Sequence, residues 1–377
     1  MLPRVQVSTS FMNQIRLKLF IFLFILLLCL QAGFLIFISG EGIKTPDQPP
    51  NLRLPYAGDN LPRSKIESNT SQALNFLFFG DLMLDRHVGE QISKNGLDYI
   101  FAELTGEENR FFKGIDLVSA NLEGAVTDNG AHYAPNMAYD FAFSPELINQ
   151  LKQYNFNFFN LANNHFTDQG SRGVDETSQN LDQLGFNYSG CPDGEIGECS
   201  STIVEIGSQK IGMAGFSIVY SRFDLISAQK IISQLTSQTD LIIVNIHWGA
   251  EYEHQFNSTQ QSIAHSLIDA GVDIIIGHHP HVAQGVEIYQ NKPIFYSLGN
   301  FVFDQYFSSD TQEGLAVGVN LTDDKRHFFL FPMQSHLSQV ELMTGKTKQD
   351  FLRRFIEWSM LDQKYKEQIR AGRLALD

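Results

Sequence analysis

Short apolar runs alternate with amphipathic stretches along most of the chain after residue 73. The apolar runs have the length of buried strands, and the stretches between them carry apolar side chains at helical spacing. This alternation is typical of an α/β domain. The strands that it predicts cover residues 74–79, 116–120, 156–161, 241–246, 272–276 and 294–298. The predicted helices cover residues 170–184, 225–235 and 259–270, and another begins near Ser144.

Towards the carboxyl terminus this alternation gives way to a hairpin and a helix. Residues 315–321 and 327–331 predict the two strands of the hairpin, and residues 351–369 predict a single closing amphipathic helix. We therefore expect one main domain over residues 74–305, which residues 306–377 complete.

The amino-terminal part holds a different pattern, a run over residues 19–38 that has no charged residue and one polar side chain, Gln31. A helix of this length crosses the ~30 Å hydrocarbon core of a membrane. Three basic residues precede the run, and no Asp or Glu occurs before Glu41. By the positive-inside rule we expect a single-pass anchor in the cell membrane, with residues 1–18 in the cytoplasm and the main domain outside it. A cleaved signal peptide is the alternative. Residues 39–73 hold five of the 12 prolines, which indicates an extended Pro-rich linker.

Charge and cysteine usage narrow the choice of partner and compartment. The formal net charge of −15 argues against nucleic acid as a partner. Cys191 and Cys199 flank a Pro-Asp-Gly turn region. In an oxidising compartment we expect a disulfide between them, and two free thiols are the alternative.

Polar side chains follow five of the predicted strands, at the point where each apolar run ends. They are Asp81, Glu123, Asn164 with His165, His247, and His279 with His281. If these strands share one sheet, their carboxyl ends meet in one crevice. Carboxylate, amide and imidazole donors together suit Mn²⁺, Fe or Zn²⁺ better than Ca²⁺. We therefore expect one or two divalent ions in an open, catalytic type of site, and a set of ordinary turns is the alternative.

Six stretches of the chain, taken in order, form a recognisable set of motifs. They are GDLMLDR at 80–86, NLE at 121–123, ANNHFTDQG at 162–170, HWGAEY at 247–252, GHHPHVAQ at 277–284 and YSLGNF at 296–301. Together they resemble the CapA family of poly-γ-glutamate capsule biosynthesis proteins, over roughly residues 74–305. That family is similar to the calcineurin-like metallophosphoesterases. The resemblance implies their four-layer α/β/β/α sandwich, with a metal site at the strand ends.

The resemblance also implies roles for single residues. The metal ligands that it implies are Asp81, Glu123, Asn164, His247, His279 and His281, with His278 as an extra imidazole. His165 would act as the general acid beside them. Asp85 and Arg86 lie in the first motif and are further catalytic candidates. Arg86 could clamp a carboxylate or phosphate group of the substrate, or it could pair with Asp85 for structural reasons.

Met83 departs from the metallophosphoesterase pattern, which has a histidine at this position of its first motif. Thioether sulfur is a poor ligand for a hard cation that carboxylates also bind. We therefore expect one of two metal positions to be missing or weak, and phosphoesterase activity stays an open question.

These observations predict a membrane-anchored, extracytoplasmic protein for the synthesis, export or attachment of poly-γ-glutamate. The implied partners are this anionic polymer or a phosphorylated substrate, and membrane-bound subunits of a polymer synthase. A hydrolase or transferase of metallophosphoesterase type would direct water or a polymer nucleophile to an acyl or phosphoryl centre, with His165 giving the proton. The alternatives are a metal-dependent phosphoesterase for a small or cell-wall substrate, and a non-catalytic subunit that binds the polymer.

Overall fold

The computed structural model describes residues 73–376, apart from 107–108, 220–221 and 323–324. The expected cytoplasmic tail (1–18), the expected anchor (19–38) and the linker up to residue 72 lie outside the described residues. Within the described ranges, no helix is both long and apolar enough to cross a membrane.

The first large sheet has the strand order β16-β15-β14-β1-β2-β5-β6, with β13 beside β1 and β17 beside β15. Its strands are β1 (Leu74–Leu82), β2 (Leu117–Leu122), β5 (Phe156–Asn160), β6 (Asn187–Ser189), β13 (Asn300–Val302), β14 (Glu313–Leu321), β15 (Arg326–His336), β16 (Gln339–Leu342) and β17 (Arg373–Leu376). Strands β1, β2, β5 and β6 run parallel, and β14 pairs with β1 in the antiparallel sense.

The second large sheet has the strand order β11-β12-β10-β9-β8-β7. Its strands are β7 (Ser201–Ile206), β8 (Gln209–Ser217), β9 (Leu241–His247), β10 (Ile274–His278), β11 (Ala283–Tyr289) and β12 (Lys292–Leu298). Strands β8, β9, β10 and β12 run parallel. A separate small sheet joins β3 (Ala125–Val126) and β4 (Ala142–Phe143).

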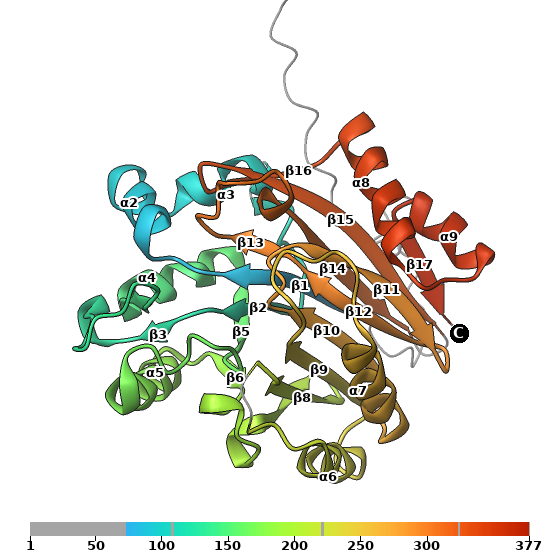
Figure 1. Cartoon of the computed structure of the whole chain (residues 1–377), viewed down its shortest axis with the longest axis horizontal. Helices are drawn as coiled ribbons and strands as arrows, with labels where there is room; N and C mark the ends of the chain where they lie inside the picture. The colour runs from blue at the N-terminus through green and yellow to red at the C-terminus, as the bar shows by residue number, and fades with distance from the viewer. Residues whose placement is uncertain (1–72, 107–108, 220–221, 323–324, 377) are drawn as a thin grey trace, which may run out of the picture. The chain divides into compact units, whose positions relative to one another are not determined.

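The two large sheets pack face to face, and helices cover their outer faces (Figure 1). Phe76 and Phe78 of β1 pack with residues of the second sheet, whereas the alternate side chains Leu77 and Phe79 pack under helices. Because both faces are buried, β1 is apolar along most of its length. Helices α2 (Arg86–Asn95), α3 (Asp98–Thr105), α4 (Pro145–Gln150) and α5 (Gly170–Leu184) cover the first sheet, and α6 (Leu225–Thr236) and α7 (Ser258–Asp269) cover the second.

Every strand that the sequence predicts is present, and α5 has the predicted bounds. The hairpin near the carboxyl terminus is also confirmed, as β14 and β15. The strands that carry the site residues do not all share one sheet, and the domain has the two large sheets of the expected sandwich. Strands β1, β2 and β5 belong to the first sheet, and β9 and β10 belong to the second. Apolar periodicity indicates that a strand is buried but not which sheet it joins.

The single closing helix expected over residues 351–369 is also wrong. The structure has two helices there, α8 (Gly345–Trp358) and α9 (Gln363–Arg370). Between them Ser359 is extended, with φ −95° and ψ 150°. The Met360 N–H donates to the Val286 carbonyl of β11 at 3.1 Å, and the Val286 N–H donates to Ser359 Oγ at 2.9 Å. The edge strand β11, which the sequence did not predict, therefore interrupts the helix.

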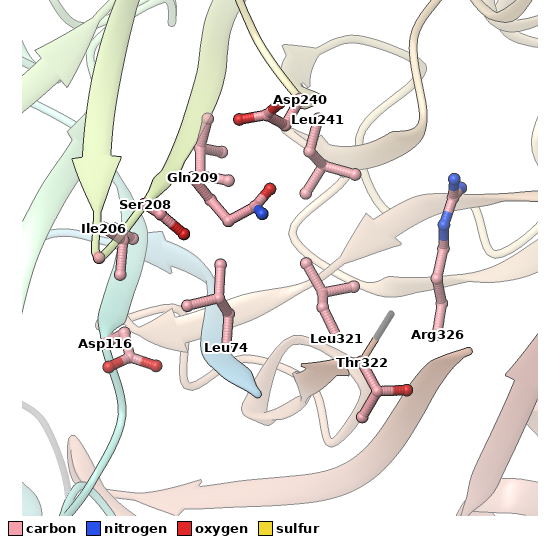
Figure 2. A pocket seen from close by; sticks show the side chains of 12 residues that line it. Leu74, Asp116, Ile206, Ser208, Gln209, Asp240, Leu241, Leu321, Thr322 and Arg326 are labelled. Atoms are coloured by element: carbon pink, nitrogen blue, oxygen red, sulfur yellow. The ribbon is translucent and has the colours of Figure 1, made fainter. Parts of the chain in front are cut away.

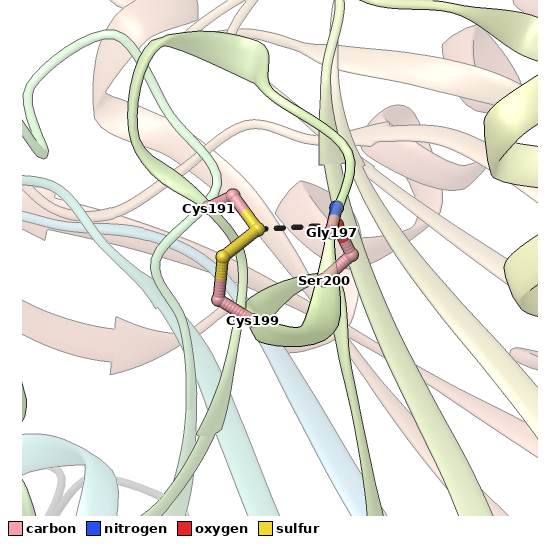
Figure 3. Close-up of a disulfide and its surroundings, with 4 residues drawn as sticks. All are labelled: Cys191, Gly197, Cys199 and Ser200. Atoms are coloured by element: carbon pink, nitrogen blue, oxygen red, sulfur yellow. Dashed lines mark hydrogen bonds between the residues drawn. A yellow bond between two sulfur atoms is a disulfide. The ribbon is translucent and has the colours of Figure 1, made fainter.

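The expected disulfide joins Cys191 and Cys199, with a Cα–Cα distance of 5.1 Å (Figure 3). Reduction is expected to lower the free energy of unfolding, because the bridge restricts the unfolded chain. The loss should be about 2–3 kcal/mol, since the bridge closes only a short loop. Urea unfolding with and without dithiothreitol measures this difference. The Cys191→Ser, Cys199→Ser double variant should not respond to the reductant, and an unchanged midpoint in the wild type would contradict the estimate.

Candidate metal centre

The predicted ligands come together where the carboxyl ends of strands from both sheets meet. Asp81 lies in β1, Glu123 directly follows β2, and His247 is the last residue of β9. The backbone N–H of His279, just after β10, donates to Asp81 Oδ2 at 3.3 Å. His247 Nε2 lies 2.7 Å from Asn164 Oδ1, so a residue that follows β5 also reaches the second sheet.

Asp81, Glu123 and His247 form a group that we call the inner group. One ligand atom of each lies within 4.8 Å of the others, and all three residues are 0% exposed. Glu123 Oε2 has no hydrogen-bond partner among the described residues. Such an orphaned, buried carboxylate oxygen is unfavourable unless a cation or another ligand meets it.

Asn121 holds the two carboxylates of the inner group together. Its Nδ2 donates to Asp81 Oδ1 at 2.8 Å and to Glu123 Oε1 at 3.0 Å. Its Oδ1 accepts from Asn160 Nδ2 at 2.8 Å and from Asn163 Nδ2 at 3.2 Å. Asn121 is the first residue of the NLE motif, and the sequence predicted no role for it. In the sequence, an asparagine at a strand end that supports a site cannot be distinguished from one that only forms a turn.

The two inner carboxyl groups have opposite electrostatic environments. Burial alone would raise the pKa of Asp81, but hydrogen bonding and charge from His281 and the charge of His278 leave that pKa below its usual value. Burial and the nearby Asp81 charge raise the pKa of Glu123 well above its usual value. Two carboxylates at close range cannot both ionise easily without a cation between them. The donor set therefore fits a divalent metal ion.

Glu251, His279 and His281 form a second group, which we call the outer group. One ligand atom of each lies within 4.8 Å of the others, and Glu251 is exposed. His281 Nδ1 lies 3.0 Å from Asn300 Oδ1, which fixes its ring. The sequence predicted both histidines as ligands, and the structure adds Glu251 from the HWGAEY motif. The extra imidazole, His278, is buried with its Nε2 3.2 Å from Asn245 Oδ1.

His165, the predicted general acid, has a defined partner. Its Nδ1 lies 2.8 Å from Asp168 Oδ2, which also accepts the Phe141 N–H at 2.8 Å. The His165 and Phe141 rings have centroids 4.3 Å apart. An ionised Asp168 can only accept, so it holds the proton on Nδ1 and leaves Nε2 for exchange with a substrate. Burial raises the pKa of Asp168. Its bond to Phe141 also ties the loop that carries His165 to the residue before β4.

Asp85 and Met83 support the local backbone. Asp85 Oδ1 accepts the Arg86 N–H at 2.6 Å and its Oδ2 accepts the Ala142 N–H at 3.1 Å, so its carboxylate caps α2 and holds β4. Met83 is fully buried in the apolar core, and its Sδ accepts the Asp85 N–H at 3.1 Å. The sulfur is therefore engaged by the backbone, in agreement with the expectation that Met83 is no metal ligand.

Arg86 does not use the carboxylate of Asp85 as its ion-pair partner. Its Nε lies 3.1 Å from Asp304 Oδ2, and its guanidinium lies 5.7 Å from the ring centroids of both Tyr139 and Phe141. Phe141 in turn contacts His165. This places a partly exposed cation close to the predicted general acid, where it can meet an anionic substrate group. Its catalytic role stays a prediction.

A cavity of about 340 Å³ lies at the opposite, amino-terminal ends of the strands. Figure 2 shows Leu74, Asp116 and Leu241 among the residues that line it. Leu74 begins β1 and Leu241 begins β9. Its lining residues include no histidine or cysteine, which makes the carboxyl edge the better candidate for metal chemistry.

Acid is expected to destabilise the metal-free chain, because buried imidazoles resist protonation. Burial lowers the pKa of His278 and of His279 from 6.5 to about 4, against an opposing charge from Asp81. As the pH falls through 6.5 the unfolded chain takes up protons that the folded chain does not, and stability is lost until about pH 4. Each shift is worth roughly 3 kcal/mol. Glu123 partly opposes the loss, since its raised pKa makes the folded chain the better proton acceptor there.

Urea unfolding at pH 7 and pH 4.5, with a chelator present, measures this loss. His278→Gln removes one titrating imidazole and should lose less stability between the two pH values than the wild type. Equal midpoints for the wild type at both pH values would contradict the expectation.

Comparison with known proteins confirms the family that the six motifs resemble. Residues 75–305 match the family model described as bacterial capsule synthesis protein PGA_cap. The chain is 30% identical over 280 residues to the capsule biosynthesis protein CapA of Bacillus anthracis, which covers 69% of this chain and 66% of that protein. It is 30% identical over 335 residues to the PGA biosynthesis protein CapA of Bacillus subtilis (strain 168), which covers 83% of this chain and 84% of that protein.

A solved structure of a hypothetical protein from Thermus thermophilus aligns with a TM-score of 0.42 and 14% identity, over 72% of this chain and 98% of that one. The family match extends over well more than half of the sequence, and the chain belongs to the PGA_cap family of bacterial capsule synthesis proteins.

Proposed function

We propose that this chain is a metal-dependent, membrane-anchored protein that acts on poly-γ-glutamate during capsule synthesis. The observation that carries the proposal is the pair of His, Asp and Glu groups at the carboxyl edge, with the His165–Asp168 pair near them. The polymer is proposed because the Bacillus relatives are a capsule biosynthesis protein and a PGA biosynthesis protein. The four-layer arrangement of the domain, as in metallophosphoesterases, supports the proposed type of site.

The chain's own residues would divide the work as follows. A divalent cation, when bound by the inner and outer groups, would polarise an acyl or phosphoryl oxygen of the substrate. Arg86 would pair with a carboxylate of the polymer, and Asp168 would orient His165. Water or a polymer nucleophile would attack the acyl or phosphoryl centre, and His165 Nε2 would deliver a proton to the leaving group as its bond to the centre breaks. Tyr139, Tyr252 and Phe307 are exposed aromatic residues that would contact the methylene groups of an extended polymer chain.

Elemental analysis of the purified full-length chain, combined with polymer assays, tests this function. Bound metal, together with a change in the length or amount of poly-γ-glutamate on incubation with the protein, is the expected result. A chain that holds no Mn²⁺, Fe or Zn²⁺ and leaves the polymer unchanged would overturn the enzymatic part. Polymer binding by the metal-stripped chain alone would favour a non-catalytic subunit.

A phosphoesterase for a small or cell-wall substrate is the second candidate, since the His165–Asp168 pair can protonate any leaving oxygen. The buried, backbone-bonded sulfur of Met83 counts against it. Hydrolysis of p-nitrophenyl phosphate with added Mn²⁺ separates it from the first. Rapid turnover of this ester, with no effect on the polymer, would favour the phosphoesterase.

Anchoring through residues 19–38 forms part of the proposal. The Cys191–Cys199 bridge supports a position outside the cytoplasm, because such bridges persist in oxidising compartments. The protein should stay with the membrane fraction after a high-salt wash, and protease added outside cells should digest the main domain. A mature amino terminus near residue 40 in a soluble fraction would contradict the anchor.

A further inference from the structure

Arg86 has an unusual backbone conformation beside the predicted general acid. Its φ of +53° lies in the left-handed region, which non-glycine residues rarely adopt. Asp85 holds this segment in place, because its Oδ1 accepts the Arg86 N–H and its Oδ2 accepts the Ala142 N–H of β4. Strained residues of this kind persist only where the surrounding structure fixes them, and they cluster at functional sites. The Arg86 side chain therefore starts from a backbone that the fold holds still.

Asp304 orients the guanidinium of Arg86. Asp304 is only 6% exposed, and its Oδ2 lies 3.1 Å from Arg86 Nε. The N–H of His87 donates to the same oxygen at 3.3 Å, and His87 Nδ1 lies 3.1 Å from it. The Nη groups of Arg86 form no ion pair within the described part of the chain. A guanidinium fixed through Nε presents the N–H donors of its two Nη groups, which match the two oxygens of a carboxylate.

Residues 141 and 142 tie the predicted general acid to this cation. The Phe141 N–H donates to Asp168 Oδ2, which is also the partner of His165 Nδ1. The centroid of the Phe141 ring lies 4.3 Å from that of His165 and 5.7 Å from the guanidinium of Arg86. A group that Arg86 binds therefore lies on the side of the site where His165 gives its proton, which is the side of the leaving group.

The part of the site around His281 is aromatic and acidic instead. The Tyr252 ring centroid lies 6.1 Å from that of His281 and 5.3 Å from that of Phe307. Tyr252 and Phe307 are exposed, and so are Glu251 and Glu253 of the same loop. Like charges repel, so a substrate carboxylate is disfavoured beside these glutamates and favoured beside Arg86.

We propose that Arg86, with Asp304 as its positioning residue, selects amides that carry a free carboxylate on the carbon bonded to the scissile nitrogen. This inference rests on the proposed function, and it names the bond that the site accepts. Every amide nitrogen of a γ-linked glutamate polymer is bonded to such a carbon. Water adds its oxygen to the carbonyl carbon, the C–N bond breaks, and the leaving nitrogen takes that electron pair and the proton of His165. The proton that the water loses restores His165, so an amide and water give a carboxyl group and an amine.

Two short substrates test this selection with the full-length chain and Mn²⁺. One is N-acetyl-γ-glutamyl-glutamate, and the other carries a carboxamide in place of the α-carboxylate of its second residue. The wild type should have a kcat/KM ~10–100-fold higher for the first, the usual contribution of charge-assisted hydrogen bonds. Arg86→Gln should lower kcat/KM for the first to the level of the second. It should leave turnover of the second unchanged, which also shows that the variant has folded.

Three further variants separate binding from structure. Arg86→Lys keeps the charge without the paired donors and should retain part of the preference. Asp304→Asn should raise KM for the carboxylate substrate with little change in kcat, because Asp304 acts through Arg86. Arg353→Gln changes an exposed arginine of α8 and should behave as the wild type.

The outcomes distinguish the subsite from the proposed function. Equal kcat/KM values of the wild type for the two substrates would overturn the subsite and leave the proposed function intact. An equal loss on both substrates in Arg86→Gln would overturn the subsite in the same way. A wild-type chain that turns over neither substrate and leaves the polymer unchanged would overturn the proposed enzymatic function, and the subsite with it.

Discussion

His165→Ala is expected to lower turnover by ~10²–10⁴-fold, the usual size of a proton-transfer contribution, while the bound metal stays in place. His165 belongs to neither the inner nor the outer group, and Asp168 is its hydrogen-bonded partner. Its loss therefore removes a proton donor without removing a ligand from either group. The measurements are bound metal, turnover of the polymer or of p-nitrophenyl phosphate, and the amount of polymer made by cells.

Two further variants define the role of His165. Asp168→Asn should lower turnover, because an amide orients the His165 ring less firmly than a carboxylate does. His336→Ala changes an exposed histidine on β15 and serves as the matched control. Loss of metal from His165→Ala would mean that His165 is a ligand. Unchanged polymer production by that variant would favour a non-catalytic scaffold.

The strands of the domain could be predicted because each is an apolar run that ends at a polar cluster. In β9, all seven residues are buried, and the run ends at His247. The pairing of strands could not be predicted in this way, since a strand with both faces buried carries no mark of its neighbours. Two sheets instead of one still bring the ends of β1 and β10 together, as the contact between Asp81 and His279 shows. The predicted ligands therefore meet although they come from two sheets.

The supporting residues of the site were harder to predict than its ligands. Asn121 contacts both inner carboxylates, and Asp168 contacts His165. Each is a short polar residue near a strand end or in a loop, where turns also favour Asn and Asp. Glu251 lies in the HWGAEY motif, but only the hydrogen bond from the Tyr252 N–H to the Pro280 carbonyl places its loop against the turn that holds His279 and His281. Such roles depend on contacts between segments far apart in the sequence.

Asp81→Asn is expected to abolish cation binding by the inner group under conditions where the wild type is saturated. The change keeps the size of the side chain but removes one of two carboxylates from the inner group. It also removes the charge that faces His278 and His281, whose Nδ1 atoms lie 3.6 Å and 3.4 Å from the Asp81 oxygens. A ligand that carries charge contributes more to metal affinity than a residue that only positions ligands. The loss should therefore exceed the ~10–100-fold that removal of a supporting residue costs.

Asn121→Ala supplies the matched comparison, because Asn121 orients both inner carboxylates through one amide. It should weaken cation binding by the inner group by ~10–100-fold. It should also lower the free energy of unfolding by about 1–3 kcal/mol, since the buried amides of Asn160 and Asn163 each lose one of two acceptors. Calorimetric titration with Mn²⁺ and urea unfolding measure the two effects separately. Wild-type affinity in Asp81→Asn would exclude Asp81 as a ligand, and a larger loss in Asn121→Ala than in Asp81→Asn would mean that the orientation of Glu123 matters more than the charge of Asp81.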